Sequence, residues 1–348
     1  MSLKGLFILD EDAQKLIYGA EEMEAISRKI TLVAPPQTSK SIARNPWMLK
    51  DVDVIISGWG APVMDADFLD QAPGLRAVFY GAGATGAWTT PEFWNRNIVV
   101  TSAVVANSVP VAEYSIATIL FSLKHGWRLA QQTRDTQSFP ARDGAPGCFR
   151  SKVGLVSLGM IGRLVAKMLQ HFDLDVLAYD PFLSQEDADR LGVRLVSLKE
   201  IFAECDAVSI HAPALPETDG MITGAHIASM KFGATLINTA RGSVVRENEM
   251  IDVLRRRADL QAVLDVTNPE PPIQNSPLYT MKNVMLTPHI AGSVGQECRR
   301  MGQYMVEELD RYLAGRPLKW QITPEMATNS SHRPRGKNKT PIVSASAV

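Results

Sequence analysis

Short apolar runs, rich in β-branched residues and separated by helical patterns, recur along most of the sequence and limit the folds open to it. The earlier runs cover residues 5–9, 30–34, 52–57, 75–80 and 97–102, and the later ones cover 152–158, 175–180, 193–196, 207–212, 234–239, 260–266 and 283–289. Because the runs are continuous rather than alternating, they predict strands buried on both faces. Strands that alternate with helices imply right-handed βαβ units. The predicted fold class is therefore α/β, with doubly wound parallel sheets.

The two sets of runs predict two domains, and a chain of 348 residues is long enough for both. The break is expected within 101–108, before a long helical pattern that includes "VAEYSIATIL". A second helical stretch, 293–315, is followed by no further strand and can return to pack on the first domain. After about residue 323 the sequence is polar and without periodicity, which predicts a flexible tail over 323–348.

The composition indicates a globular protein without a surface for nucleic acid or membrane. Hydrophobic residues make up 45% and charged residues 21%, and the formal net charge is -1, whereas such surfaces need a basic excess. The longest apolar stretch, "SIATILFSL", is shorter than the roughly 20 residues of a membrane span. Cys148, Cys205 and Cys298 lie far apart, which favours small buried residues in a reducing compartment, with no metal site. The N-terminus turns acidic too soon for a secretory signal, so we expect a cytoplasmic protein.

The segment "VGLVSLGMIG" (153–162) matches the dinucleotide-binding pattern Gly-x-Gly-x-x-Gly, except that Ser157 replaces the first glycine. In a cofactor loop, Gly159 would let the backbone approach a pyrophosphate at the helix N-terminus, and Gly162 would let the helix pack close to its strand. The first glycine mainly serves the tightness of the turn, so a small serine is tolerated best there. Taken alone, the segment is weak evidence for a cofactor loop and favours an ordinary strand-to-helix turn; the neighbouring segments change that balance.

Asp180 ends the next apolar run, close to the distance of roughly 20 residues at which a carboxylate binds the adenosine ribose. The alternative is an acid that caps the turn before Pro181. A carboxylate at this position repels a 2′-phosphate, and no arginine follows at once in "YDPFL". The sequence therefore favours NAD over NADP.

Three charged residues follow later apolar runs: Arg241 in "LINTARGSVV", Glu270 in "LDVTNPEPP" and His289 in "NVMLTPHIAGS". Open parallel sheets bind ligands at the carboxyl ends of their strands. Arginine can grip a carboxylate, histidine can exchange a proton at neutral pH, and a neighbouring carboxylate favours the imidazolium. That set suits reduction of a 2-keto acid, although each residue alone is consistent with a structural role.

Together, these segments resemble the D-isomer-specific 2-hydroxyacid dehydrogenases, the family of phosphoglycerate and glycerate dehydrogenases and of hydroxypyruvate and glyoxylate reductases. The resemblance covers roughly residues 50–320 and includes "HAPALPETDGMI" and "SPLYTMKNVMLTPHIAGS" in the family's order. It implies a flavodoxin-like substrate domain from 1–103 plus 293–322 and an inserted Rossmann-type NAD domain over 104–292. It also implies a homodimer formed through the inserted domain.

By this resemblance Arg241 would bind the substrate carboxylate and carbonyl. His289 would act as general acid in reduction and as base in oxidation, with Glu270 as its partner, and Asp265 would hold the nicotinamide amide. The implied cofactor-binding residues are Ser157, Gly159, Met160, Ile161, Gly162, Asp180, His211, Ala212, Pro213, Thr239, Ala240, Asp265, His289 and Gly292. The implied substrate-binding residues are Trp59, Ala82, Gly83, Arg241 and His289.

Two departures from the phosphoglycerate dehydrogenase pattern favour an unphosphorylated substrate. "GWG" (58–60) stands where those enzymes have an arginine for the phosphate, which places Trp59 near that position. The sequence also ends in the polar segment rather than a regulatory domain. Formate dehydrogenases have a glutamine where Glu270 stands, so formate is disfavoured. The predicted reaction is reduction of a small 2-keto acid to the D-2-hydroxy acid with NADH, and the reverse.

Two other functions stay open. The first is a non-catalytic, NAD(H)-sensing or corepressor-like protein on the same scaffold, although Arg241, Glu270 and His289 are all present. The second is a nucleotide-binding methyltransferase, which would use the glycine turn and Asp180 but gives no role to "TARG" or "TPH".

Overall fold

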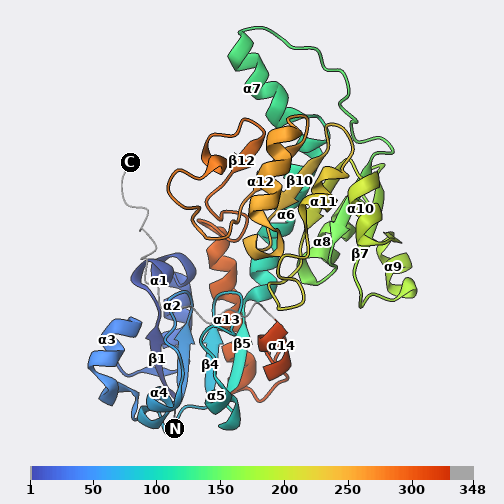
Figure 1. Ribbon diagram of the computed structural model, residues 1–348. Coiled ribbons are helices and arrows are strands. Elements are labelled where there is room, and N and C mark those ends of the chain that lie inside the picture. Colours follow the sequence, from blue (N-terminus) through green and yellow to red (C-terminus); the bar gives the residue numbers. More distant parts are fainter. Residues whose placement is uncertain (1, 330–348) are drawn as a thin grey trace.

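The computed structural model describes residues 2–329 and contains two separate parallel sheets (Figure 1). The first sheet has the order β2-β1-β3-β4-β5, which is the flavodoxin-like arrangement. Its strands are β1 (Lys4–Ile8), β2 (Thr31–Leu32), β3 (Val54–Ser57), β4 (Ala77–Tyr80) and β5 (Val99–Ser102). Its helices are α1 (Glu11–Ile17), α2 (Ala20–Ser27), α3 (Ser39–Arg44), η1 (Pro46–Leu49), α4 (Ala66–Gln71), α5 (Pro91–Asn95), α13 (Glu297–Leu313) and α14 (Pro324–Asn329).

The second sheet has the order β12-β11-β10-β9-β6-β7-β8, which is the Rossmann order extended by one strand. Its strands are β6 (Lys152–Val156), β7 (Asp175–Tyr179), β8 (Arg194–Leu195), β9 (Ala207–Ile210), β10 (Thr235–Asn238), β11 (Gln261–Leu264) and β12 (Val284–Leu286). Its helices are α6 (Val104–Ser122), α7 (Gly126–Thr136), α8 (Met160–Leu169), α9 (Gln185–Leu191), α10 (Leu198–Glu204), α11 (Gly224–Ala228), η2 (Gly242–Val244), α12 (Glu247–Arg256) and η3 (Pro277–Tyr279). Every predicted apolar run contains or overlaps one of the strands, so the α/β fold class is confirmed.

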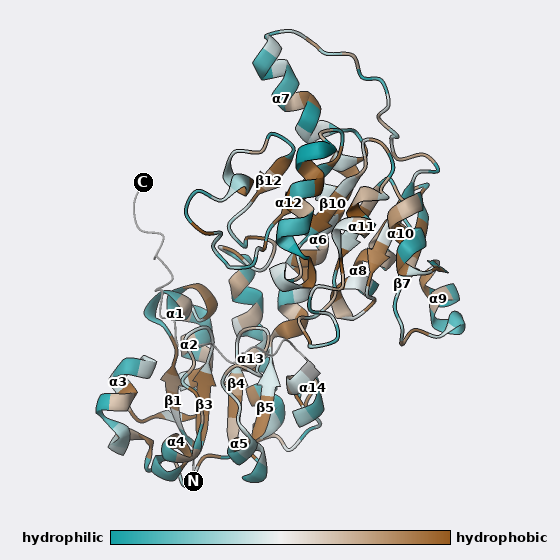
Figure 2. Cartoon of the chain, viewed as in Figure 1, coloured by the Kyte–Doolittle hydropathy of each residue, from teal (hydrophilic) through white to brown (hydrophobic). Residues whose placement is uncertain are grey.

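Both sheets are buried on both faces, as continuous apolar runs require. In β1, for example, Leu6 and Ile8 belong to the core on one face of the first sheet, whereas Phe7 belongs to the core on the other. Hydrophobic residues therefore concentrate on the strands, and polar ones on the outer helices α7 and α12 (Figure 2).

Helix α6 is, among the described residues, the one helix long and apolar enough to cross a membrane by length and composition. The apolar stretch "SIATILFSL" covers only the second half of this helix, because polar residues interrupt its first half. In the fold, α6 contacts α8, α13, β9 and β10, and Ala112, Ser115 and Ile119 are buried there. It packs as an internal helix between the other elements.

The predicted return of the chain to the first domain is observed. Helix α13 contacts α1, α2, β4 and β5, and the segment after it pairs with the edge of β5 in the antiparallel sense. The predicted tail differs from expectation at its start, because α14 forms over its first residues and buries Ala327 in the core. Thr323 and Pro324 are favourable residues for the start of a helix, which the search for periodicity overlooked. Residues 330–348 lie outside the described part of the chain.

The three cysteines are free, and two of them, Cys205 and Cys298, are buried as predicted. Burial raises the pKa of the Cys205 thiol to about 12. Cys148 differs from the prediction because it is partly exposed, in the segment that follows α7.

Candidate active site

The predicted site residues of the second sheet lie at the carboxyl ends of its strands, in loops or, for Met160, Ile161 and Gly162, in the first turn of α8. The loops follow β12 (His289), β11 (Asp265 and Glu270), β10 (Thr239, Ala240 and Arg241), β9 (His211, Ala212 and Pro213), β6 (Ser157 and Gly159) and β7 (Asp180). All neighbouring strands are parallel, so these loops share one edge of the sheet. The strand order reverses between β6 and β9, which separates the charged loops from the glycine turn. This reversal is the usual place for a nucleotide in such sheets.

The turn after β6 has the geometry of a glycine-rich loop although it begins with serine. Ser157 has a φ of 74°, in the left-handed region that favours glycine. A Cβ on Gly162 would clash with the Ser157 carbonyl oxygen, so close packing of α8 on its strand requires this glycine. Open space surrounds Gly159, and α8 begins at the next residue, Met160. The N–H groups of the first turn of α8 have no partner within the helix, so an anion such as a pyrophosphate fits there.

Asp180 lies beside this turn and braces it. Its carboxylate accepts hydrogen bonds from the backbone N–H of Leu158, at 2.7 Å, and of Phe182, at 2.8 Å. A carboxylate has about four acceptor positions, so it can also accept hydrogen bonds from ribose hydroxyls. The two alternatives drawn from the sequence, a bracing acid and a ribose ligand, are therefore compatible.

The loop after β9 carries an unusual histidine. Burial lowers the pKa of His211 to about 4, so the ring is neutral at physiological pH. Its Nε2 is buried without a hydrogen-bond partner, which costs free energy unless a ligand or water supplies one. Ala212 is buried next to it and Pro213 is half-buried. The loop therefore presents one unsatisfied polar atom in a largely apolar setting.

The loop after β10 is shaped by a residue that the sequence analysis did not select. The Asn238 side chain accepts a hydrogen bond from Ala240 N–H and donates one to the Arg241 carbonyl, both at 3.0 Å. A Cβ on Gly242 would clash with the backbone at Thr267, so this loop packs directly on the one after β11. These contacts hold the backbone on both sides of Arg241, and its Nη1 atom donates a 2.6 Å hydrogen bond to the Ala240 carbonyl. Burial lowers the pKa of Arg241, and the Glu270 charge opposes that effect.

His289 and Glu270 form the central pair of the site. The Nδ1 atom of His289 lies 2.5 Å from Oε1 of Glu270, and both side chains are about half exposed. The hydrogen bond to Glu270 raises the pKa of His289, while burial and the nearby Arg241 charge act in the opposite direction. Three charged groups from three loops therefore lie close enough to influence one another. With Nδ1 engaged, Nε2 is the ring atom left for a substrate.

Asp265 organises the loop that holds His289. Its Oδ1 accepts hydrogen bonds from Thr287 Oγ1, at 2.7 Å, and Ile290 N–H, at 2.8 Å. Its Oδ2 accepts one from Ala291 N–H, at 2.9 Å. An acceptor position remains on Oδ2, which fits the amide that the family resemblance assigns to Asp265.

The predicted substrate residues of the first sheet also follow strands at their carboxyl ends. Trp59 follows β3 and is 37% exposed, so part of its ring is available for contact. Ala82 and Gly83 follow β4, and their carbonyl groups accept hydrogen bonds from Ser102 Oγ. The main-chain N–H groups of that loop thus remain the ones suited to a carboxylate.

Asn107, on the first turn of α6, connects the two sets of loops. Its side chain lies beside Gly83 and Gly292, and its Oδ1 accepts a 2.9 Å hydrogen bond from Ser293 N–H. Asn107 lies within the predicted domain break, 101–108, where no site residue was expected. Its contacts bring the predicted substrate loop next to the end of the His289 loop.

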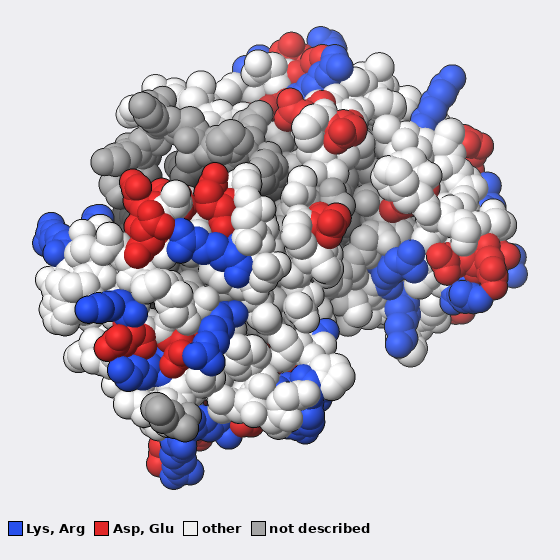
Figure 3. Space-filling model, turned by 90° about the horizontal axis from the view of Figure 1, so that it is seen from below, with Lys and Arg blue, Asp and Glu red and all other residues white. Residues whose placement is uncertain are grey.

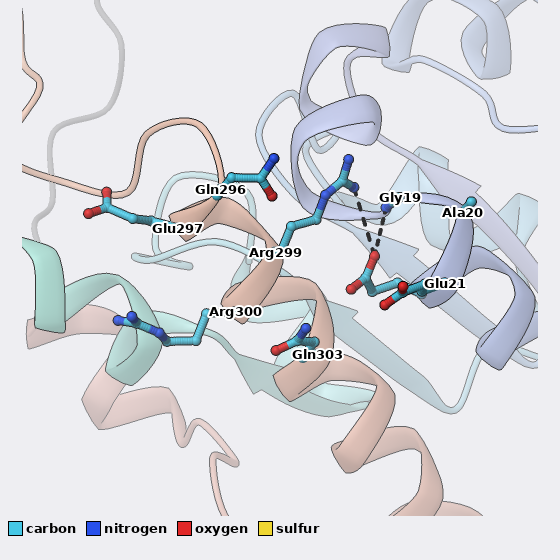
Figure 4. A pocket seen from close by; sticks show the side chains of 9 residues that line it. Gly19, Ala20, Glu21, Gln296, Glu297, Arg299, Arg300 and Gln303 are labelled. Carbon is cyan, nitrogen blue, oxygen red and sulfur yellow. Dashed lines mark hydrogen bonds and ion pairs between the residues drawn. The ribbon is translucent and has the colours of Figure 1, made fainter.

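A hollow of about 540 Å³ lies between α2 and α13 and contains none of the predicted site residues. Arg299 reaches from α13 to the buried Glu22, which also accepts a 2.9 Å hydrogen bond from Gly19 N–H (Figure 4). Arg300 points away from Arg299, so the two guanidinium groups do not converge on one ligand (Figure 4). We interpret the Arg299–Glu22 pair as an anchor of α13 on the first domain.

The family model for the "D-isomer specific 2-hydroxyacid dehydrogenase, NAD binding domain" matches residues 116–291 of this chain. A D-3-phosphoglycerate dehydrogenase of Archaeoglobus fulgidus is 31% identical over 74% of this chain and 49% of its own length. A glyoxylate reductase of Korarchaeum cryptofilum is 29% identical over 81% of this chain and 85% of its own. The chain thus spans about half the length of the first of these relatives.

A solved structure, the D-mandelate dehydrogenase of Rhodotorula graminis, has the same fold, with a TM-score of 0.77. It is 23% identical in sequence, and the alignment covers 93% of this chain and 98% of that one. The fold of this chain is therefore shared with a solved structure over nearly its whole described length.

Proposed function

Because this chain belongs to the D-isomer-specific 2-hydroxyacid dehydrogenase family, we propose that it reduces a small, unphosphorylated 2-keto acid to the D-2-hydroxy acid with NADH, and catalyses the reverse. The observation that carries the proposal is the 2.5 Å pair of His289 and Glu270 with Arg241 beside it. A proton donor and a carboxylate-binding cation thus lie together at the carboxyl edge of a nucleotide-binding sheet.

The chain's own residues would hold the cofactor across that edge. The N-terminus of α8 at Gly159 would bind the pyrophosphate, and Asp180 would bind the ribose hydroxyls. The unsatisfied Nε2 of His211 would contact a polar group of the same cofactor, and the remaining acceptor position of Asp265 would accept a hydrogen bond from its amide. Hydride transfer to the carbonyl carbon is the chemistry that NADH supplies when bound.

Arg241 would bind the substrate carboxylate through two parallel hydrogen bonds and polarise the neighbouring carbonyl. The main-chain N–H groups at Ala82 and Gly83 would hold the same carboxylate from the other domain. His289, protonated and oriented by Glu270, would donate its Nε2 proton to the carbonyl oxygen as carbon accepts the hydride. In oxidation the neutral ring would remove the hydroxyl proton.

The side chains at the end of β3 support an unphosphorylated substrate. Trp59 is apolar and partly exposed there, and its carbonyl accepts a 2.9 Å hydrogen bond from Asp10 N–H. The Asp10 carboxyl group also lies directly against Gly60. An aromatic ring with a carboxylate next to it offers no partner for a phosphate and repels its charge.

We also propose a homodimer formed through α7 and the segment after it. Helix α7 projects from the second domain (Figure 1) and buries none of its residues. Phe139 and Phe149 in the following segment are 92% and 69% exposed. Exposed aromatic side chains beside a projecting helix are typical of an interaction surface, and we propose that a second copy of the chain covers them. Sedimentation of the native chain and of a Phe139→Ser/Phe149→Ser variant tests this, and a native monomer would contradict it.

The charge distribution bears on nucleic acid and membranes as partners. Acidic and basic side chains are interspersed on the face seen in Figure 3, without one continuous basic patch there. Together with the free cysteines, this supports a small-molecule substrate and a cytoplasmic location. Cell fractionation tests the location.

The activity is tested by following NADH oxidation with glyoxylate, hydroxypyruvate, pyruvate and an aryl pyruvate, with NADPH as the control cofactor. We expect turnover with at least one keto acid, its loss in His289→Ala, and D stereochemistry of the product. Tight NADH binding without turnover of any keto acid would instead support the NAD-sensing alternative.

A further inference from the structure

A chain of hydrogen bonds connects helix α6 to the loop that carries His289. The Tyr114 hydroxyl lies 3.0 Å from Thr287 Oγ1, which donates a 2.7 Å hydrogen bond to Asp265 Oδ1. The same carboxylate accepts the backbone N–H of Ile290 at 2.8 Å. This series of hydrogen bonds therefore holds the backbone on both sides of His289, at Thr287 and at Ile290.

The direction of these hydrogen bonds follows from chemistry. An ionised carboxylate only accepts, so the single hydroxyl hydrogen of Thr287 is used by Asp265. Tyr114 must then be the donor to Thr287. Burial raises the pKa of Tyr114, which keeps its hydroxyl protonated and able to donate. Hydrogen bonds that run in one direction through a buried site strengthen one another.

The His289 loop needs such support because its backbone is strained. His289 has a φ of 55°, in the left-handed region, where a side chain with a Cβ is disfavoured. Its N–H donates to the carbonyl groups of Asp265 and Thr287, each at 3.0 Å. A strained conformation persists only where the surroundings hold it from several sides.

We propose that Tyr114 is a positioning residue that acts through Thr287 and Asp265 to fix the His289 backbone, so that the imidazole stays paired with Glu270. The inference rests on the proposed function of His289 as the proton donor. Tyr114 itself contacts neither His289 nor Glu270 in any hydrogen bond of the described chain.

The charged groups that face His289 are Glu270, Arg241 and Asp265. Of these, Glu270 has the largest effect and raises the pKa of His289 through the direct hydrogen bond. A more mobile His289 loop would weaken the hydrogen bond between His289 and Glu270 more than the longer-range effects of Arg241 and Asp265, because a hydrogen bond depends most steeply on distance. The pKa of His289 is therefore expected to fall when Tyr114 loses its hydroxyl.

The test uses the ligand-free full chain and an NMR titration of the His289 ring. The sequence has six histidines, and the signal lost in His289→Gln assigns the resonance. We expect Tyr114→Phe to lower the His289 pKa. In keto-acid reduction, the same variant should lower kcat about 2- to 10-fold, as for the loss of one hydrogen bond, with little change in KM for NADH. Tyr304→Phe is the matched control, because Tyr304 stacks on Trp320 and its hydroxyl makes no hydrogen bond among residues 2–329.

Variants of Thr287 test whether the effect passes through it. Thr287→Val removes the hydroxyl between Tyr114 and Asp265 and should lower the pKa of His289 at least as much as Tyr114→Phe. Thr287→Ser keeps that hydroxyl and should leave the pKa of His289 at its native value. The double variant Tyr114→Phe/Thr287→Val should be no worse than Thr287→Val alone, since residues of one chain do not act additively.

Additive effects, or a His289 titration unchanged in Tyr114→Phe, would overturn the inference. The titration needs neither substrate nor cofactor, so it distinguishes this outcome from a failure of the proposed function. Absence of keto-acid turnover in the native chain would disprove the function while leaving the hydrogen-bond chain and its effect on His289 measurable.

Discussion

The carboxylate of Asp180 accepts a 2.7 Å hydrogen bond from the N–H of Leu158, the residue that follows Ser157 in the turn. The acid expected to select the cofactor therefore also holds the turn that would bind its pyrophosphate. Changes at Asp180 should therefore affect both the stability of the turn and the affinity for the cofactor.

Replacing Ser157 with glycine should stabilise the protein. The left-handed φ of 74° costs a serine roughly 1–2 kcal/mol, part of which is offset by the greater freedom of glycine in the unfolded chain. We expect the free energy of unfolding to rise by up to about 1 kcal/mol, with NADH affinity kept. Urea denaturation measures it. Ser229→Gly is the control, because Ser229 has a φ of -79° and should only lose stability.

Replacing Asp180 with asparagine should change cofactor preference. Asparagine keeps an acceptor for Leu158 N–H but removes the charge that binds ribose hydroxyls and repels a 2′-phosphate. Hydrogen bonds to a charged group contribute about 1.5–3 kcal/mol, so NADH affinity should fall at least about tenfold. NADPH affinity should fall less or increase. Fluorescence titration with both cofactors measures the ratio, and an unchanged ratio would argue against the ribose role.

Replacing Glu270 with glutamine should shift the pH dependence of reduction. The hydrogen bond to Glu270 raises the pKa of His289, and reduction requires the protonated ring. Activity is thus present below that pKa and is lost as the pH rises through it. In Glu270→Gln the falling limb of kcat/KM should move to lower pH. If kcat/KM falls at the same pH in both proteins, the proton donor is a group other than His289.

The same pair predicts a small effect on stability with a defined sign. Because folding raises the pKa of His289, the pair stabilises the fold fully below the ordinary pKa of histidine. This contribution is lost as the pH rises through the raised folded-state value. Half of each side chain is exposed, so the effect is screened by solvent. Urea denaturation of native and Glu270→Gln protein, below and above that range, should differ only at the lower pH.

Replacing Arg241 with lysine should reduce catalysis although the charge is kept. A lysine cannot form two parallel hydrogen bonds with a carboxylate. Losing one charged hydrogen bond of about 1.5–3 kcal/mol predicts at least a tenfold fall in kcat/KM for the keto acid. NADH affinity should not change. Steady-state kinetics with a direct NADH titration separates the two, and an equal loss of NADH affinity would contradict the assignment.

Much of the fold could be predicted because the signals are local. Continuous apolar runs identify each strand, and their grouping identifies the two sheets. The helix α14 was not predicted, because among its residues 324–328 only Ala327 is buried, which leaves no periodicity in the sequence. The length of the apolar helix α6 was not recognised in the sequence, because polar residues such as Ser108 precede the apolar stretch and yet are buried in the fold.

The candidate site was predictable only where residue type points to chemistry. Arg241, Glu270 and His289 were selected for that reason, and the 2.5 Å contact between the last two follows from loops that are adjacent in the sheet. Asn238 and Tyr114 were not selected, because their roles are hydrogen bonds to positions fixed by the tertiary fold. A single sequence carries no signal for such contacts. Nor does it show that Ser157 adopts a glycine-like backbone.

The hydrogen bond from Ser293 N–H to Asn107 Oδ1 has a consequence for how such a chain can be assembled. It shows that the polypeptide leaves the seven-stranded unit almost where it entered it. A short turn from Ala103 to Ser293 would close the five-stranded unit into a continuous chain without displacing a strand of its sheet. The seven-stranded unit is thus an inserted domain whose two connections to the five-stranded unit lie side by side. Domains connected in this way can be gained, exchanged or removed with the least disturbance to the rest of the chain.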